Sequence, residues 1–173
     1  MSSESCAVFL GTVGWLHPSW QGSFYPDDLP QDWLLAYYNT QFRSVFLPHA
    51  DWTSATDAQL AQWVQDSQPG FRFVLESGPS RAAAGHAADI LGERLGMITH
   101  RGDPRLLWFD AETKLKALAR EIGRRDKPCF YSVWMPTWPA CSGWPPCPSS
   151  WVGRIAATGT AAVLGLSRPD RLR

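Results

Sequence analysis

The chain has 173 residues, of which 45% are hydrophobic, which is typical of one globular domain with a sizeable core. Its 16 Lys and Arg residues balance its 16 Asp and Glu residues, so it lacks the positive field that draws proteins onto nucleic acid. The first residues have no basic signal-peptide segment, and no apolar run approaches the roughly 20 residues of a membrane span, so we expect a cytoplasmic location and neither a nucleic-acid nor a membrane partner.

The first predicted element is a buried strand near residues 7–11, which Gly11 and Gly14 end sharply. A loop with several prolines and aromatic residues follows it. Its rings allow two interpretations. They plug the core, which large aromatic side chains do without any ligand, or Trp15, Trp20 and Tyr25 form a platform that binds a small polar molecule. We favour the plug.

Next, a leucine and aromatic stripe predicts an amphipathic helix from Asp32 to Phe42, followed by a strand at 43–47 that Pro48 stops. We expect His49, Asp51 and Trp52 to form a polar-aromatic loop. Capping-box spacing then predicts a helix that begins after Thr56 and ends at Pro69-Gly70. A strand at 71–76 and a weaker helix at about 83–94 follow.

Further strands are predicted at 95–99, 105–110 and 129–135, and an apolar stripe predicts a helix at 111–125. Strands that alternate with helices indicate an α/β fold with a parallel sheet. Because eight βα units normally need about 250 residues, five or six strands indicate an incomplete TIM-like (β/α) barrel or an open parallel sheet. The open edge of such a sheet favours self-association.

Residues 1–135 form the predicted α/β domain, and the character of the chain changes at 136–173. Six of the 14 prolines lie in this tail, and no regular period survives there. Three interpretations remain open: a poorly ordered tail, an out-of-frame segment that replaces lost barrel strands, or a proline- and tryptophan-rich recognition arm.

Several polar residues follow predicted strands and could meet at one rim. They are His17, His49, Asp51, Glu76, His100 and Asp110. Imidazoles and carboxylates can collect a divalent metal, but none of these residues has diagnostic spacing. The four cysteines form no Cys-x-x-Cys pair, so neither a zinc site nor a disulfide framework is indicated. We therefore predict no metal site, and the sequence names no cofactor.

The opening motif resembles a known family. Gly11-Thr12-x-Gly14-Trp15, then Pro18-x-Trp20, Gly22-x-Phe24-Tyr25-Pro26 and Leu29-Pro30, followed by Trp33, Tyr37-Tyr38 and Pro69-Gly70-Phe71, is similar to the signature of the YecE-like family. The resemblance covers roughly the first half of the chain. It implies a TIM-type barrel without an established activity. The lone His86 aligns loosely with a histidine of the family.

The departures from the family pattern are at strand ends, where barrel active sites lie. The resemblance implies an acidic residue and an asparagine where this chain has Phe46 and Pro48, and a lysine where it has Glu76. Two interpretations follow. One is a non-catalytic or degenerate partial barrel, in which Glu76 repels anions. The alternative is an enzyme that acts on a small polar substrate at the strand C-termini, with or without the help of a metal ion. The candidate catalytic residues are then His17, His49, Asp51, Glu76 and Asp110.

Overall fold

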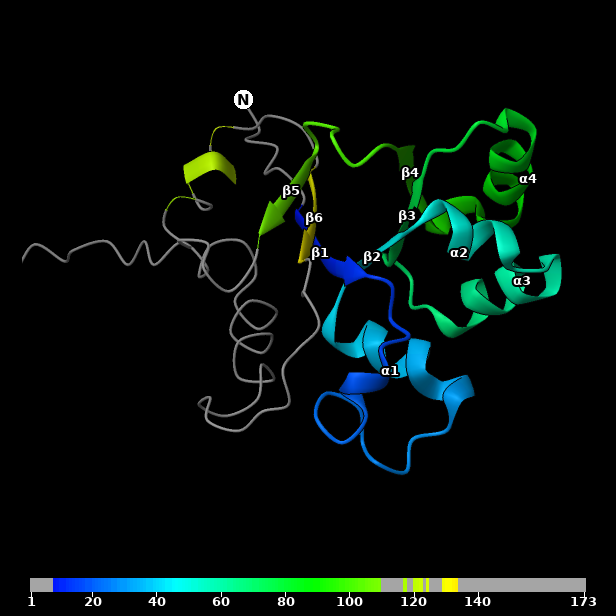
Figure 1. Cartoon of the computed structure of the whole chain (residues 1–173), viewed down its shortest axis with the longest axis vertical. Coiled ribbons are helices and arrows are strands. Elements are labelled where there is room, and N and C mark those ends of the chain that lie inside the picture. Colours follow the sequence, from blue (N-terminus) through cyan, green and yellow to red (C-terminus); the bar gives the residue numbers. More distant parts are fainter. Residues whose placement is uncertain (1–7, 110–116, 118–119, 123, 125–128, 134–173) are drawn as a thin grey trace, which may run out of the picture.

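The computed structural model describes residues 8–109, 117, 120–122, 124 and 129–133 (Figure 1). The strands are β1 (Val8–Val13), β2 (Ser44–Leu47), β3 (Arg72–Glu76), β4 (Leu95–Thr99), β5 (Leu106–Phe109) and β6 (Cys129–Val133). The helices are α1 (Leu34–Gln41), α2 (His49–Ser54), α3 (Asp57–Asp66) and α4 (Arg81–Leu91). Short 3₁₀ turns lie at Pro18–Trp20, Gln31–Trp33 and Gly92–Arg94.

The described strands form one open sheet of six, in the order β4-β3-β2-β1-β6-β5. Every neighbouring pair is parallel. The α/β class, the parallel sheet and the strand number predicted from the sequence are therefore confirmed. Helices follow β1, β2 and β3, as βα units require.

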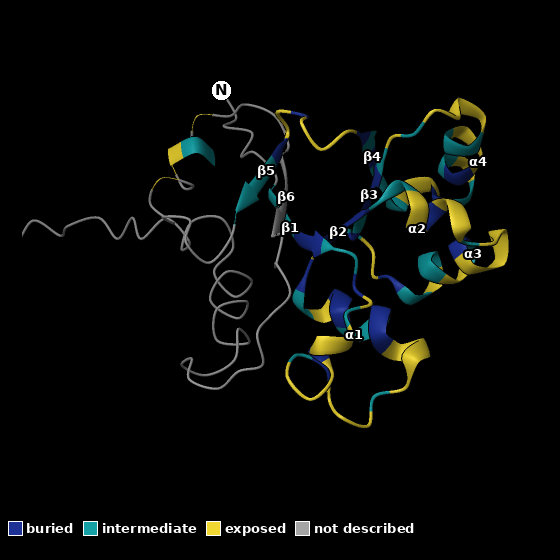
Figure 2. Ribbon diagram, viewed as in Figure 1, coloured by how far each residue is buried: buried dark blue, intermediate teal, exposed yellow. Residues whose placement is uncertain are grey.

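Alternate residues of the strands pack into two separate cores, one on each face of the sheet. Val45, Leu47, Phe73 and Leu75 join the core beneath the helices, to which α1, α3 and α4 contribute their buried faces (Figure 2). Their neighbours Phe46 and Val74 belong to a smaller cluster on the other face. Both faces of β2 and β3 are thus buried, which explains why these strands read as continuous apolar runs.

The smaller cluster shows that the sheet curves. It joins Phe46 of β2 and Val74 of β3 to Met97 of β4 and Leu106 of β5. Strands β4 and β5 are the two ends of the sheet order, so their side chains can share one cluster only if the sheet bends around it. The six described strands therefore form a curved open sheet with an apolar cluster on its concave face.

The aromatic loop after β1 is part of the outer core. Trp15, Trp20 and Tyr25 are all buried. The Trp20 ring packs on Phe24, with ring centroids 5.0 Å apart, and lies parallel to the Tyr38 ring at 6.4 Å. Trp15 packs edge-on against Trp63 of α3. These contacts favour the plug interpretation, because packing alone accounts for the burial of each ring.

A buried hydroxyl ties this core to the sheet. The Tyr38 hydroxyl of α1 accepts the backbone N–H of Thr12 at 2.8 Å and donates to the Ser44 carbonyl at 2.9 Å. It therefore bridges α1 to β1 and β2. Burial raises the pKa of Tyr38 above its ordinary value, so the phenol stays neutral.

One sequence-based expectation about local structure is wrong. Residues 49–54, predicted as a loop, form the helix α2. The Pro48 dihedrals place it at the N-cap, and the hydroxyls of Thr53 and Ser54 donate to carbonyls one turn earlier. Trp52 is buried and anchors the turn. Pro48 thus both follows the end of β2 and caps α2, with the non-helical ψ of 147° that an N-cap residue adopts.

The capping box before α3 is confirmed, because Thr56 and Gln59 exchange side-chain and backbone hydrogen bonds. The expected helix at 111–125 is helical at 117 and 120–122, and its remaining residues except Arg124 lie outside the described residues. The tail at 136–173 and Asp110 also lie outside them. Among the residues that are described, no helix is long and apolar enough to cross a membrane.

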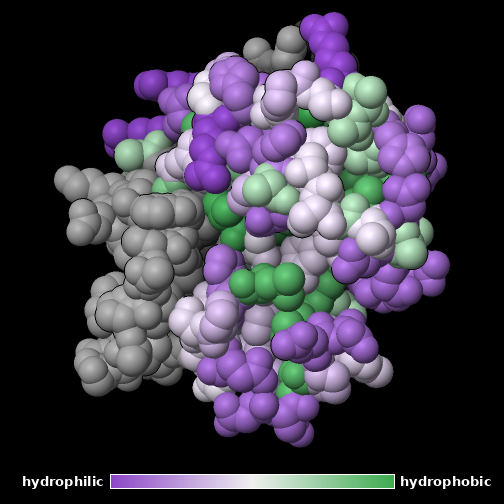
Figure 3. Space-filling model, turned by 45° about the vertical axis from the view of Figure 1, so that its right-hand side comes forward, coloured by the Kyte–Doolittle hydropathy of each residue, from purple (hydrophilic) through white to green (hydrophobic). Residues whose placement is uncertain are grey.

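The face shown in Figure 3 is largely hydrophilic where it is coloured, with separate apolar patches between the polar residues. Among the described residues, the large hydrophobic side chains that remain exposed are Leu16 and Trp33, at 66% and 64%. Trp33 thus belongs to the same motif as Trp20, but its side chain is mostly exposed whereas that of Trp20 is buried.

Candidate functional site

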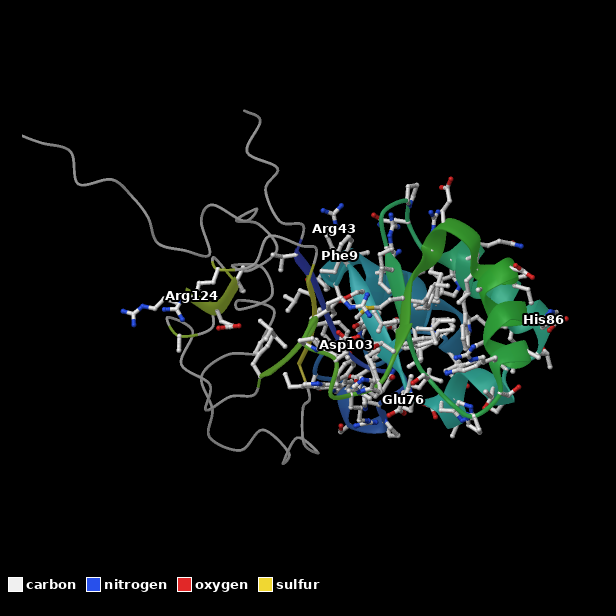
Figure 4. The ribbon with its side chains drawn as sticks, turned by 90° about the horizontal axis from the view of Figure 1, so that it is seen from above. Phe9, Arg43, Glu76, His86, Asp103 and Arg124 are labelled. Carbon is white, nitrogen blue, oxygen red and sulfur yellow. The ribbon has the colours of Figure 1, made fainter. Side chains whose placement is uncertain are left out.

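The carboxyl ends of β2, β3 and β4 bring polar groups together at one edge of the sheet. Glu76 ends β3, His49 begins the helix that follows β2, and Arg101 and Asp103 lie in the turn after β4. Parallel pairing puts these ends side by side, and Figure 4 shows Glu76 and Asp103 toward the same end of the strands, away from Phe9 and Arg43. This edge is where ligands bind in parallel α/β proteins.

Glu76 is the centre of the hydrogen bonding at this edge. Its Oε1 accepts from Nε of Arg101 at 2.8 Å, and its Oε2 accepts from the backbone N–H of His49 at 3.1 Å. Burial by itself raises the pKa of Glu76, but the bonds from Arg101 and His49 outweigh it, and the pKa is lowered. The carboxylate is therefore ionised and paired at neutral pH.

Arg101 is held from three directions. Besides the bond to Glu76, its guanidinium carbon lies 5.5 Å from the ring centroid of Phe46 and 5.8 Å from that of Trp108. The Trp108 indole N–H donates to the Arg101 carbonyl at 2.8 Å. The side chain is still half exposed, so the cation is fixed in position but remains accessible to solvent.

A second carboxylate closes the turn after β4. Asp103 is buried and accepts the hydroxyl of Thr99 and two side-chain N–H groups of Arg105, at 3.0 and 2.7 Å. The bonds from Arg105 are the largest of the effects that hold the pKa of Asp103 well below its ordinary value. Arg105 donates both of these bonds within its own turn, so the pair stabilises the turn after β4.

The His49 ring does not pair with the carboxylate next to it. Its Nε2 is buried and has no hydrogen-bond partner among the described residues. The ring lies directly against Gly78, where a Cβ would come within 1.9 Å of Nε2. His49 therefore contributes its backbone N–H to Glu76 and uses its ring for packing.

The other candidate residues are more scattered. His17 donates from Nε2 to the Val13 carbonyl at 2.7 Å and packs on Trp20, so it belongs to the aromatic loop. Asp51 is exposed on α2, and His100 accepts the N–H of Gly102. His86 lies on α4, where Figure 4 shows it far from Glu76, and it pairs with Asp57 of α3 at 2.9 Å.

Of the predicted rim residues, the structure thus joins His49 and Glu76 by a hydrogen bond. Within the part of the chain that is described, no three His, Cys, Asp or Glu side chains are placed to hold a metal ion. The sequence reasoning missed Arg101, Asp103 and Trp108. Arg101 and Asp103 could have been found from their position in the turn after the strand predicted at 95–99, within three residues of His100.

Phe46 shows what replaces the acidic residue implied by the family resemblance. The side chain is 1% exposed and packs edge-on against Trp108, with ring centroids 5.3 Å apart. An apolar ring therefore lies under the Arg101 guanidinium. The expected repulsion of anions by Glu76 also changes, because Arg101 neutralises its charge.

Comparison with known proteins finds a family model and a solved structure that resemble this chain. A family model described as a protein of unknown function, DUF72, matches residues 9–80. The chain is also similar to the crystal structure of a DUF72 family protein from Thermotoga maritima, with 22% sequence identity and a TM-score of 0.44. That match covers 74% of this chain and 55% of the other, so the chain spans about half the length of that protein. No curated protein matches the chain.

Proposed function

We propose that this chain is a DUF72 protein of the YecE-like type, and that its incomplete TIM-like barrel is a non-catalytic binding module. The fold and the family match at 9–80 support the first part. The second part depends on one observation, the state of Glu76 at the C-terminal edge of the sheet.

A general base works best when its pKa is near the operating pH and a lone pair faces the substrate. Glu76 lacks the first property, because its pKa is lowered. Each of its oxygens also accepts a hydrogen bond from the chain itself, which weakens it further as a base. It is a weak base at neutral pH, and its proton affinity is too low for a general acid.

The alternative function is an enzyme that acts on a small polar substrate at this edge, with or without a metal. One observation favours it: Glu76, the backbone of His49 and Arg101 do meet where barrel enzymes bind substrates. A substrate that displaced Arg101 from Glu76 would free one carboxylate oxygen for chemistry.

The test is an activity panel of hydrolase, isomerase and lyase substrates with the unmodified chain, with and without divalent metals. We expect no turnover above a Glu76→Gln control. Turnover that needs Glu76 or His49, and that survives in a Trp33→Ala control with an exposed substitution, would establish the enzyme instead. Restoring the family residues by Phe46→Glu is a poor test, because it buries an unpaired charge in the interior cluster.

A further inference from the structure

We propose that Arg101 forms a binding site for a small oxyanion, a carboxylate or phosphate group, at the C-terminal edge of the sheet. This inference goes beyond the proposed function, because a binding site of this kind serves a catalyst and a non-catalytic module equally. It depends on the geometry of one guanidinium group and on what its neighbours leave free.

A guanidinium group is planar and carries five N–H donors that lie in that plane. Glu76 uses the Nε donor of Arg101. Within the described part of the chain, the two Nη atoms of Arg101 make no hydrogen bond. Their shared edge presents two parallel N–H groups, which match the two oxygens of a carboxylate or phosphate.

One side of the guanidinium is covered as well. Phe46 and Trp108 both lie within 6 Å of its central carbon, and their ring centroids are 5.3 Å apart, so the two rings lie on the same side of the group and shield it there. The bond from Trp108 to the Arg101 carbonyl fixes the backbone, and Glu76 fixes the rotation of the side chain. A donor that is already fixed loses less conformational entropy when a ligand binds.

The nearby charges leave Arg101 as the suitable cation. Arg105 in the same turn has a similar exposure, but its fork is committed to the buried Asp103. Each carboxylate here has its own arginine, so formal charge cancels within the two pairs. Binding would therefore depend on hydrogen-bond geometry more than on net charge, and Arg101, which gives only Nε to its carboxylate, has more free donors than Arg105, which gives Nε and one Nη.

The experiment is a titration of the full chain with inorganic phosphate and, separately, with acetate, at constant ionic strength. Binding is followed by NMR through the Arg101 side-chain Nε–H signal, with thermal shift as a second readout. We expect a saturable shift of that signal. Whichever probe binds more tightly distinguishes a phosphate ligand from a carboxylate ligand.

Variants locate the site. Arg101→Gln should weaken binding at least about tenfold, since it removes a charge-assisted bidentate contact. Arg101→Lys keeps the charge but loses the fork, so its affinity should lie between those of the unmodified chain and Arg101→Gln. Arg124→Gln is the matched control, because it removes the same charge from a residue that Figure 4 shows far from Glu76. Absence of saturable binding by either probe, or equal losses in Arg101→Gln and Arg124→Gln, would overturn the proposal.

Discussion

The interpretation of the aromatic loop as a core plug can be tested by comparing two tryptophans of the same motif. Trp20 is 6% exposed, and its ring packs on His17, Phe24 and Tyr25. Trp33 is 64% exposed. The matched substitutions Trp20→Ala and Trp33→Ala remove the same atoms, one set from the core and the other from the surface.

The expected costs differ severalfold. Removing a buried tryptophan loses its transfer free energy and leaves a cavity, and costs about 3 to 5 kcal/mol. The rings around Trp20 belong to the loop and to α1, and they are His17, Phe24, Tyr25 and Tyr38. They cannot all move into the space that Trp20 leaves, so we expect the upper half of that range. Trp33→Ala should cost within about 0.5 kcal/mol, as exposed substitutions do.

Urea denaturation followed by far-UV circular dichroism measures both costs, with the slope checked for constancy. If Trp20→Ala does not fold, Trp20→Phe is the milder variant and should still cost more than Trp33→Ala. Equal stabilities of the Trp20 and Trp33 variants would refute the plug. Loss of ligand binding by a Trp20→Ala protein that is as stable as its parent would favour the aromatic platform.

Four further predictions follow from the packing and the charges. Tyr38→Phe should lower the free energy of unfolding by about 1 to 3 kcal/mol, because it leaves the buried Thr12 N–H without its acceptor; a change below 0.5 kcal/mol, roughly the surface value, would contradict this. Gly11→Ala should prevent folding, since a Cβ there would lie 1.9 Å from the Ser44 carbonyl oxygen; a native-like circular dichroism spectrum of this variant would contradict the prediction. The folded pKa of Asp103 is below the unfolded value of about 4, so its contribution is present above pH 4 and lost below it; in urea titrations against pH, Asp103→Asn should lower neutral stability and flatten the acid limb, and an unchanged limb would argue against the pairing. Sedimentation velocity should show concentration-dependent association, because β4 and β5 each have one edge unpaired within the described sheet, whereas a monomer at every concentration would count against it.

The sequence predicts the strands better than what joins them. Strands such as Arg72–Glu76 and Leu95–Thr99 have apolar runs, bounded by polar or glycine-containing turns, that leave few alternatives. The sequence pattern does not show the helix at His49–Ser54, because its 6 residues make fewer than two turns, too few for a 3.6-residue period to appear. Its stability comes from Trp52, which is buried and donates to the Glu76 carbonyl, a contact 24 residues away in sequence.

The site is less predictable because its contacts are long-range. Strand ends identify Glu76 and His49 as neighbours, since parallel pairing determines which ends meet. Nothing local indicates that the His49 ring packs on Gly78, or that Arg101 rests on Phe46 and Trp108. Such contacts depend on how the sheet curves, which brings β5 against β2 although they are far apart in the strand order.

Glu76 illustrates why a charge reversal must be read with its partner. Taken alone, a carboxylate where the family resemblance implies a lysine predicts repulsion of an anion. Because Arg101, 25 residues later in sequence, donates to this carboxylate, Glu76 instead supplies the group that orients a cation. Removing Glu76 alone would have two opposite effects on anion binding. Loss of the negative charge would strengthen binding, whereas loss of the bond that orients Arg101 would weaken it. Only a cycle with Glu76→Gln, Arg101→Gln and the double variant separates the coupling within the pair from the contribution of Arg101 to a ligand.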